Sequence, residues 1–202
     1  MRRLLAAGQV GPAQFRAALT DKAPSERDGW VDAVFGLDAL PDDGPELPRG
    51  CVPYLPSPVH TLLTMIDIVG MQPSDVFVDV GSGLGRATTL VHCLTGAGAI
   101  GLEIQPALVN GSRELAARLN ATRVSVVEGD AARFTRTMTI GTVFFLYCPF
   151  GGERLHQVML GLAELARVRR LHVCSLDLPL PSCSWLTPVS SVDNLAVYRS
   201  RA

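Results

Sequence analysis

Residues 76–85 read VFVDVGSGLG, a short apolar strand with an aspartate that runs into a turn of three alternating glycines. The dinucleotide fingerprint is G-x-G-x-x-G, in which the third glycine allows close packing of helix and strand. Here that third position holds Arg86, and the last glycine comes one residue earlier, at Gly85. The pattern therefore favours a nucleoside without a pyrophosphate over a dinucleotide. A glycine turn alone decides little, because many strand-to-helix turns need glycine only for its positive φ.

Two further apolar stretches also end in acids. Residues 99–103 read AIGLE and residues 124–130 read VSVVEGD, so Glu103 and Asp130 follow strand-like runs, as Asp79 does. In right-handed βαβ units such strands lie side by side, and ligands bind at their carboxyl ends. A carboxylate at Glu103 is placed to accept both hydroxyls of a ribose, and Asp130 to meet the amino group of adenine. One strand-end acid is common on structural grounds, but the ordered set of three indicates a nucleoside site.

This set of motifs resembles the class I S-adenosylmethionine (SAM) methyltransferases over roughly residues 54–199. The resemblance implies that the glycine turn lies under the methionine moiety, that the second acid holds the ribose, and that the third contacts adenine. It also implies SAM as cofactor and S-adenosylhomocysteine as product. The cofactor-binding residues expected on this basis are Tyr54, Asp79, Gly81, Ser82, Gly83, Gly85, Glu103, Ile104, Asp130, Ala131 and Tyr147.

Within that superfamily, residues 65–85 and 143–157 are most similar to the non-SET histone-lysine methyltransferases. That likeness implies that Tyr54 lies near the methionine end of the cofactor; the alternative is an aromatic anchor for its loop. The chain departs from this family where paired asparagines are expected, since Leu146 and Tyr147 stand there. Tyr147 is the candidate catalytic residue, which would orient or deprotonate an acceptor; the alternative is a structural tyrosine at the sheet edge.

The rest of the pattern predicts an α/β fold. Strands are expected at 76–80, 99–103, 124–127, 142–147 and 170–176, and helices at 84–95, 106–119, 131–137 and 152–166. Such alternation predicts a mainly parallel sheet with helices on both faces. Residues 185–189 and 195–199 suggest a C-terminal antiparallel hairpin. The expected fold is thus a Rossmann-like seven-stranded sheet with a helical N-terminal segment.

Composition and prolines suggest how the chain is organised. At 202 residues and 48% hydrophobic, the chain has enough apolar material for one sizeable core. We expect residues 1–50 to form a helical and proline-rich segment before a SAM-binding core at 51–202. Ser25 is expected to begin a helix with a capping box, and Ser57 to cap a helix that runs to about residue 69. Six prolines lie between residues 41 and 58; this stretch is expected to be either a lid or substrate wall, or a plain connector.

The net charge and the cysteine spacing indicate which kinds of partner and site the sequence disfavours. The formal net charge is −1, and no basic block is longer than Arg169-Arg170, so a long nucleic acid is disfavoured as the acceptor. The five cysteines include no C-x-x-C, which indicates neither a disulfide framework nor a metal site. No apolar run approaches the roughly 18 residues of a membrane span, and no signal-length segment begins the chain. A cytoplasmic protein without membrane partners is expected.

The sequence therefore predicts a SAM-dependent methyltransferase acting on a small-molecule or protein side-chain acceptor. Such an enzyme works mainly by aligning the acceptor and excluding water. The alternative is a noncatalytic SAM-binding or interaction module, which the altered loop after residue 146 favours. A nicotinamide-dependent oxidoreductase is disfavoured by Arg86 at the third-glycine position and by the acid at Asp130.

Overall fold

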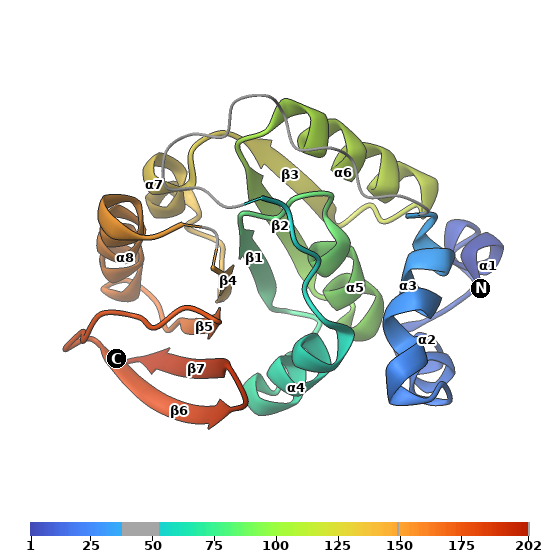
Figure 1. Cartoon of the computed structure of the whole chain (residues 1–202), viewed down its shortest axis with the longest axis horizontal. Coiled ribbons are helices and arrows are strands. Elements are labelled where there is room, and N and C mark those ends of the chain that lie inside the picture. Colours follow the sequence, from blue (N-terminus) through green and yellow to red (C-terminus); the bar gives the residue numbers. More distant parts are fainter. Residues whose placement is uncertain (38–52, 149, 202) are drawn as a thin grey trace.

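The computed structural model describes residues 1–37, 53–148 and 150–201. Seven strands form one sheet in the order β3-β2-β1-β4-β5-β7-β6 (Figure 1). The pairings β1–β2, β2–β3, β1–β4 and β4–β5 are parallel, whereas β7 runs antiparallel to both β5 and β6. The predicted Rossmann-like sheet with its terminal hairpin is confirmed. The strands are β1 (Val76–Val80), β2 (Gly98–Glu103), β3 (Val124–Glu128), β4 (Val143–Tyr147), β5 (His172–Leu176), β6 (Leu186–Val192) and β7 (Leu195–Ser200).

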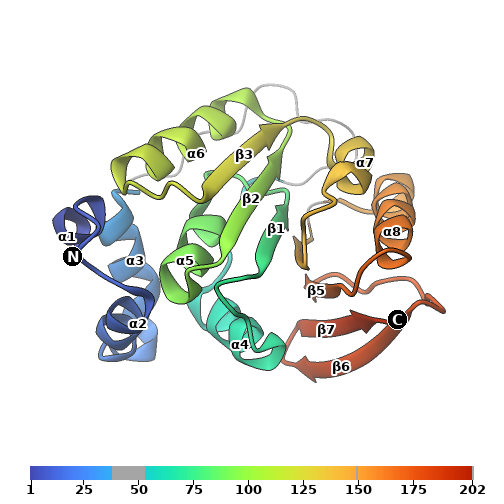
Figure 2. The same ribbon diagram turned by 180° about the vertical axis from the view of Figure 1, so that it is seen from behind.

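Helices cover both faces of the sheet (Figures 1 and 2). Successive side chains of a strand point to opposite faces. Accordingly, Phe77 and Phe145 belong to one hydrophobic cluster, whereas their neighbours Val78 and Phe144 belong to the other. The first cluster includes α4 (Val59–Val69), α5 (Arg86–Thr95) and α6 (Pro106–Arg118); the second includes α7 (Ala131–Phe134) and α8 (Gly152–Ala166). Two 3-10 turns are also present, η1 (Pro24–Glu26) and η2 (Thr135–Thr137).

The N-terminal helices are part of the first cluster. They are α1 (Arg2–Ala6), α2 (Pro12–Thr20) and α3 (Arg27–Phe35). Phe15 and Phe35 are completely buried, with ring centroids 6.4 Å apart, in the same cluster as Leu62 of α4 and Leu90 of α5. The described part of the predicted 1–50 segment is thus helical and packs into the core of the protein. Residues 38–52, with three of the six prolines, lie outside the described residues.

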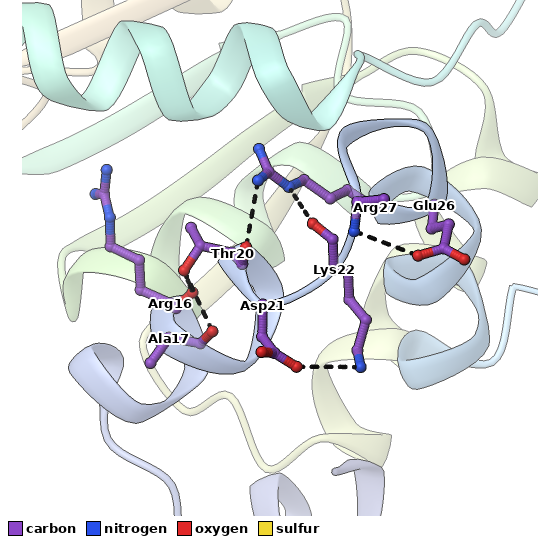
Figure 3. Close-up of polar contacts among 8 residues, drawn as sticks. Arg16, Ala17, Thr20, Asp21, Lys22, Glu26 and Arg27 are labelled. Carbon is purple, nitrogen blue, oxygen red and sulfur yellow. Dashed lines mark hydrogen bonds and ion pairs between the residues drawn. The ribbon is translucent and has the colours of Figure 1, made fainter.

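A small polar network shapes the corner between α2 and α3. The Arg27 guanidinium reaches back over the corner and donates to the carbonyl oxygens of Lys22 (3.2 Å) and Thr20 (3.4 Å) (Figure 3). Glu26 accepts a hydrogen bond from the Ala23 N–H at 3.3 Å. These bonds satisfy backbone groups that a helix end leaves without intrahelical partners.

The capping residues predicted for two helices are wrong. No Ser25 capping box forms: Ser25 lies in η1, and α3 begins at Arg27. Ser57 does not cap α4 either. That helix begins at Val59, whose N–H donates to the Asp28 carboxylate at 3.1 Å. The cap therefore comes from a residue of α3, which no local pattern shows.

None of the helices within the described ranges is long and apolar enough to cross a bilayer.

Candidate functional site

A cavity of about 490 Å³ opens at the carboxyl ends of β1 to β5. Nine of the eleven residues predicted to bind cofactor line it: Tyr54, Asp79, Gly81, Ser82, Glu103, Ile104, Asp130, Ala131 and Tyr147. The three strand-end acids thus meet in one place, because parallel strands end at the same edge of the sheet. Gly83 and Gly85 lie in the same turn without lining the cavity. Lining residues that the sequence analysis did not predict to bind include Arg86, Gln105, Leu108, Phe150, Arg154 and Asp177.

The glycine turn is built from left-handed backbone. Gly81, Gly83 and Gly85 have φ values of 87°, 54° and 73°, a region that side chains other than glycine rarely adopt. A Cβ at Gly85 would overlap the Ser112 hydroxyl of α6, and one at Gly83 would overlap the Tyr54 ring. The space above Gly83 is therefore filled by Tyr54, an aromatic contact that the spacing of the glycines did not predict.

Glu103 holds this turn in place. Its Oε2 accepts from the N–H of Gly83, and its Oε1 accepts from the N–H groups of Ile104 and Gln105, each at 2.8 Å. The residue is only 6% exposed. A carboxylate has about four acceptor positions, so within the described structure one remains, on Oε2. This geometry suits one ribose hydroxyl, whereas two were predicted from the sequence.

Replacing Glu103 with alanine is expected to weaken SAM binding about tenfold or more, because a charge-assisted hydrogen bond contributes about 1.5–3 kcal/mol. The variant also loses the acceptor for the Gly83 N–H, so thermal stability should fall with affinity. Isothermal titration calorimetry and a melting curve measure the two effects. Glu103→Gln, which keeps the shape and one carbonyl oxygen, should lie between wild type and Glu103→Ala. An unchanged dissociation constant in Glu103→Ala would remove Glu103 from the binding site.

Asp79 lines the cavity and is 4% exposed. Burial raises its pKa well above the usual range for a carboxyl, and the neighbouring Glu103 carboxylate raises the pKa further. The side chain is thus held in its protonated form at pH values where exposed carboxyls are charged. A cation in the cavity would favour the ionised form, because opposite charges attract strongly where water is excluded.

SAM binding is therefore expected to depend on pH. SAM carries a positive sulfonium, so binding should lower the pKa of Asp79 and release a proton. The dissociation constant should fall as pH rises through the raised pKa of Asp79 in the free protein. Calorimetry in buffers of different ionisation enthalpy counts the released protons. Asp79→Asn cannot ionise and should lose this dependence; a variant with the same pH profile as wild type would contradict the assignment.

Asp130 makes two bonds of its own. Oδ1 caps α7 by accepting from the Ala132 N–H at 3.0 Å, and Oδ2 forms an ion pair with Arg154 at 2.7 Å. The sequence predicted an adenine contact for this acid, and the structure places it on the cavity wall with Arg154 of α8 beside it. Its contact with adenine stays a prediction.

Arg86 joins the N-terminal helices to the glycine turn. It is 3% exposed, and its guanidinium binds Asp32 (2.6 Å), Asp28 (3.0 Å) and the Ser57 carbonyl (2.7 Å). The residue that replaces the third glycine of the dinucleotide fingerprint is thus the buried centre of an ion-pair network whose two acids are partly exposed. The sequence showed the replacement but not its partners, which lie 29 to 58 positions away.

The residues present fit SAM. Ser82 is 4% exposed, lines the cavity, and its hydroxyl has no hydrogen-bond partner among the described residues. A buried hydroxyl without a partner costs about 1–3 kcal/mol, which a polar ligand would recover. Acceptors at Asp79 and Glu103 suit the cationic and hydroxyl groups of SAM, and apolar Ile104, together with Leu108, suits the flat adenine.

Tyr147 ends β4 and lines the cavity, and it is followed by Cys148 with φ of 40°. Burial raises the pKa of the Tyr147 phenol, and the charges of Asp177 and Cys148 raise the pKa further. The phenol is thus kept protonated, which favours donation of a hydrogen bond to an acceptor over removal of its proton. Its catalytic role stays a prediction.

Comparison with solved structures identifies methyltransferases. An RNA methyltransferase from Salinibacter ruber in complex with S-adenosyl-L-homocysteine is 27% identical, with a TM-score of 0.59 over 72% of this chain and 92% of that one. A putative methyltransferase from Escherichia coli is 20% identical, with a TM-score of 0.60 over 78% and 91%. A putative caffeoyl-CoA O-methyltransferase from Staphylococcus aureus is 10% identical, with a TM-score of 0.57 over 75% and 86%. The last two show the fold alone. A search of curated proteins gives no significant match.

The first of these structures corrects one expectation. The sequence disfavoured a nucleic acid as the acceptor, and that expectation is weakened because an RNA methyltransferase is among the similar proteins. The predicted cofactor is confirmed by the S-adenosyl-L-homocysteine in that structure together with the family match. The model of the protein-L-isoaspartate(D-aspartate) O-methyltransferase family matches residues 26–135, more than half of the sequence. The chain therefore belongs to this family of SAM-dependent methyltransferases.

Proposed function

We propose that this protein transfers the methyl group of SAM to a small-molecule or protein side-chain acceptor that approaches the carboxyl ends of β4 and β5. The observation that carries the proposal is the convergence on one cavity of Asp79, Glu103 and Asp130 with the Ser82 hydroxyl, which has no hydrogen-bond partner in the described part of the chain. Tyr147 and Cys148, at the end of β4, also line that cavity.

The cavity supplies what methyl transfer requires of a protein. SAM brings a methyl carbon that its sulfonium already activates, so the protein has to align the acceptor and exclude water. Glu103 and Asp79 would hold the cofactor, and the Tyr147 hydroxyl would orient the acceptor by a hydrogen bond. The sequence-based proposal of a lid or substrate wall at residues 41–58 falls mostly on residues outside the described ranges, and a cytoplasmic location is likewise proposed from the sequence.

The acceptor has several candidates. The name of the matched family points to isoaspartyl residues of proteins, and the Salinibacter ruber structure points to RNA. The likeness to the non-SET histone-lysine methyltransferases rests on sequence pattern alone; the reported comparisons do not support it. The alternative of a noncatalytic SAM-binding module is favoured by Leu146 and Tyr147 where that family has asparagines.

Two measurements test the proposal. Calorimetry should detect SAM binding and no NAD binding. Formation of S-adenosylhomocysteine should then be measured with four acceptors in parallel: an isoaspartyl peptide, a lysine-containing peptide, a mixture of small amines and acids, and total RNA. Turnover with any of them that falls in Glu103→Ala supports an enzyme. SAM binding without turnover of any acceptor would favour the noncatalytic module, and absence of SAM binding would overturn both.

A further inference from the structure

The amino-terminal edge of the sheet, opposite the cofactor cavity, is rich in arginine. The parallel strands begin at this edge and the antiparallel β7 ends there, so the segments that border it come from distant parts of the chain. In the described loops that lead into β1 to β5, the one acid is Asp75. Six arginines border the edge: Arg123 before β3, Arg167, Arg169 and Arg170 between α8 and β5, Arg199 in β7, and Arg201 after it.

Three of these arginines, Arg170, Arg199 and Arg201, are exposed and lie around His172 at the start of β5. Arg199 pairs in register with His172 and with Thr187 of β6, and the Arg201 guanidinium donates to the Thr187 hydroxyl at 3.2 Å. Burial lowers the pKa of the His172 imidazole, and the charges of Arg199 and Arg170 lower this pKa further. None of the three arginines forms an ion pair with a described residue.

Asp75 does not neutralise this group of cations. Its charge opposes that of the arginines at His172, where it raises the pKa of the imidazole. Its carboxylate also accepts hydrogen bonds from the Thr142 hydroxyl at 2.9 Å and from the Gln72 N–H at 2.8 Å. Three guanidinium groups thus stand against one carboxylate, and the surface around His172 is positive.

Two further arginines extend the positive charge along the edge. Arg123 donates to the carbonyl oxygens of Gly96 (2.6 Å) and Pro73 (3.2 Å), in the loops before β2 and β1, and Arg169 donates to that of Thr139, before β4. β1 lies three strands from β7, which is about 14 Å at the usual spacing of neighbouring strands. A row of cations of this length suits an extended polyanion better than a single small anion.

An aromatic side chain lies at the end of this row. Trp185 is half-buried, directly precedes β6, and accepts the Arg201 N–H on its carbonyl oxygen at 2.8 Å. Proteins hold single-stranded nucleic acids with cations that follow the phosphates and with aromatic rings on which bases stack. A peptide rich in carboxylates would satisfy the cations but offers no base to the indole.

We propose that this arginine row (Arg123, Arg169, Arg170, Arg199 and Arg201), together with Trp185, binds a single-stranded nucleic acid through its phosphates and one base. The guanidinium fork matches the geometry of phosphate oxygens. β5 has five residues, so about 16 Å of strand separates the row from the cavity. The nucleic acid is therefore a docking partner rather than the methyl acceptor, and the inference goes beyond the proposed function.

The test measures the binding of fluorescein-labelled oligouridine and oligothymidine of about 20 nucleotides to the full chain, by fluorescence anisotropy from about 50 to about 200 mM salt. The variant combines Arg170→Gln, Arg199→Gln and Arg201→Gln. The control combines Arg3→Gln, Arg113→Gln and Arg133→Gln, which are also exposed, lie outside the row, and change the net charge equally. Melting curves verify that both variants fold.

The wild-type protein should bind one or both oligonucleotides, and the preferred one distinguishes RNA from DNA. The row variant should lose at least tenfold in affinity at the lowest salt. For single strands the slope of log K against log salt is about −0.7 per neutralised phosphate, so the slope should become shallower by about 2. The control variant should lose less than threefold and keep the slope. Trp185→Leu should weaken oligonucleotide binding about fivefold or more and leave the binding of inorganic polyphosphate, which has no bases, unchanged.

Absence of oligonucleotide binding, or equal losses in the row variant and the control variant, would overturn the inference. Equal effects of Trp185→Leu on oligonucleotide and polyphosphate would overturn the choice of nucleic acid, as would tighter binding of a polyglutamate peptide or of phosphatidylserine vesicles. Competition by saturating S-adenosylhomocysteine would place the oligonucleotide in the cavity and would also contradict the row. Failure to bind SAM would contradict the proposed function alone, because the row needs no cofactor.

Discussion

Replacement of Arg86 by methionine is expected to lower the free energy of unfolding by about 3 kcal/mol, near the low end for breaking a buried ion pair. The low end applies because Asp28 and Asp32 are 47% and 36% exposed in their side chains and can be hydrated once the cation is gone, whereas Arg86 itself is 3% exposed. Urea unfolding followed by circular dichroism measures the change. SAM affinity should fall as well, since Arg86 also binds the Ser57 carbonyl beside the cavity.

A surface pair provides the matched control. Arg16 and Asp67 are 2.7 Å apart with side chains 34% and 62% exposed, so Arg16→Met should change stability by less than about 1 kcal/mol. Arg86→Lys keeps the charge but not the planar fork that reaches three partners, and it should fall between wild type and Arg86→Met. Equal stability of Arg86→Met and Arg16→Met would show that the network does not hold the N-terminal helices to the core.

Replacement of Gly83 by valine should abolish measurable SAM binding. Two effects combine there: a left-handed backbone, which costs a residue with a Cβ roughly 1–2 kcal/mol, and overlap of the new Cβ with the Tyr54 ring. The Tyr54 ring therefore has to move. Because Tyr54 and the glycine turn both contribute to the cavity wall, this movement changes the shape of the cavity. Calorimetry with SAM and a melting curve report the loss of affinity and of stability.

Gly70 separates the two effects. It has φ of 66° at the end of α4, and apart from its chain neighbours no atom of the described residues lies within 4 Å of a Cβ placed on it. Gly70→Val therefore carries the backbone strain without the overlap and should leave SAM affinity near wild type. The double variant Gly83→Val with Tyr54→Ala lacks the ring and should recover part of the stability that Gly83→Val loses. A double-mutant cycle measures this coupling. Additive losses would show that Tyr54 does not limit the space above Gly83.

The sequence by itself determined the sheet and the place of the site. Apolar runs and their spacing predicted the five parallel strands and the hairpin, because side-chain periodicity reports which face of an element is buried. The convergence of Asp79, Glu103 and Asp130 also followed from order along the chain, since consecutive parallel strands end at one edge. These properties depend on local sequence pattern and on the right-handed crossover that connects parallel strands.

Only the tertiary structure decided how the site is held. Asp28 caps α4 across 31 positions, Arg86 binds two acids of α3, and Tyr54 covers Gly83. Asp177 lines the same cavity as Tyr147 because β5 pairs with β4, although no motif surrounds it. Each of these contacts joins residues far apart in the chain, and the energy of such a contact depends on which surfaces the packed helices and strands bring together. A local sequence pattern carries no information about which surfaces meet. The ion-pair partners, the helix caps and the lining of the cavity are therefore known only from the folded structure.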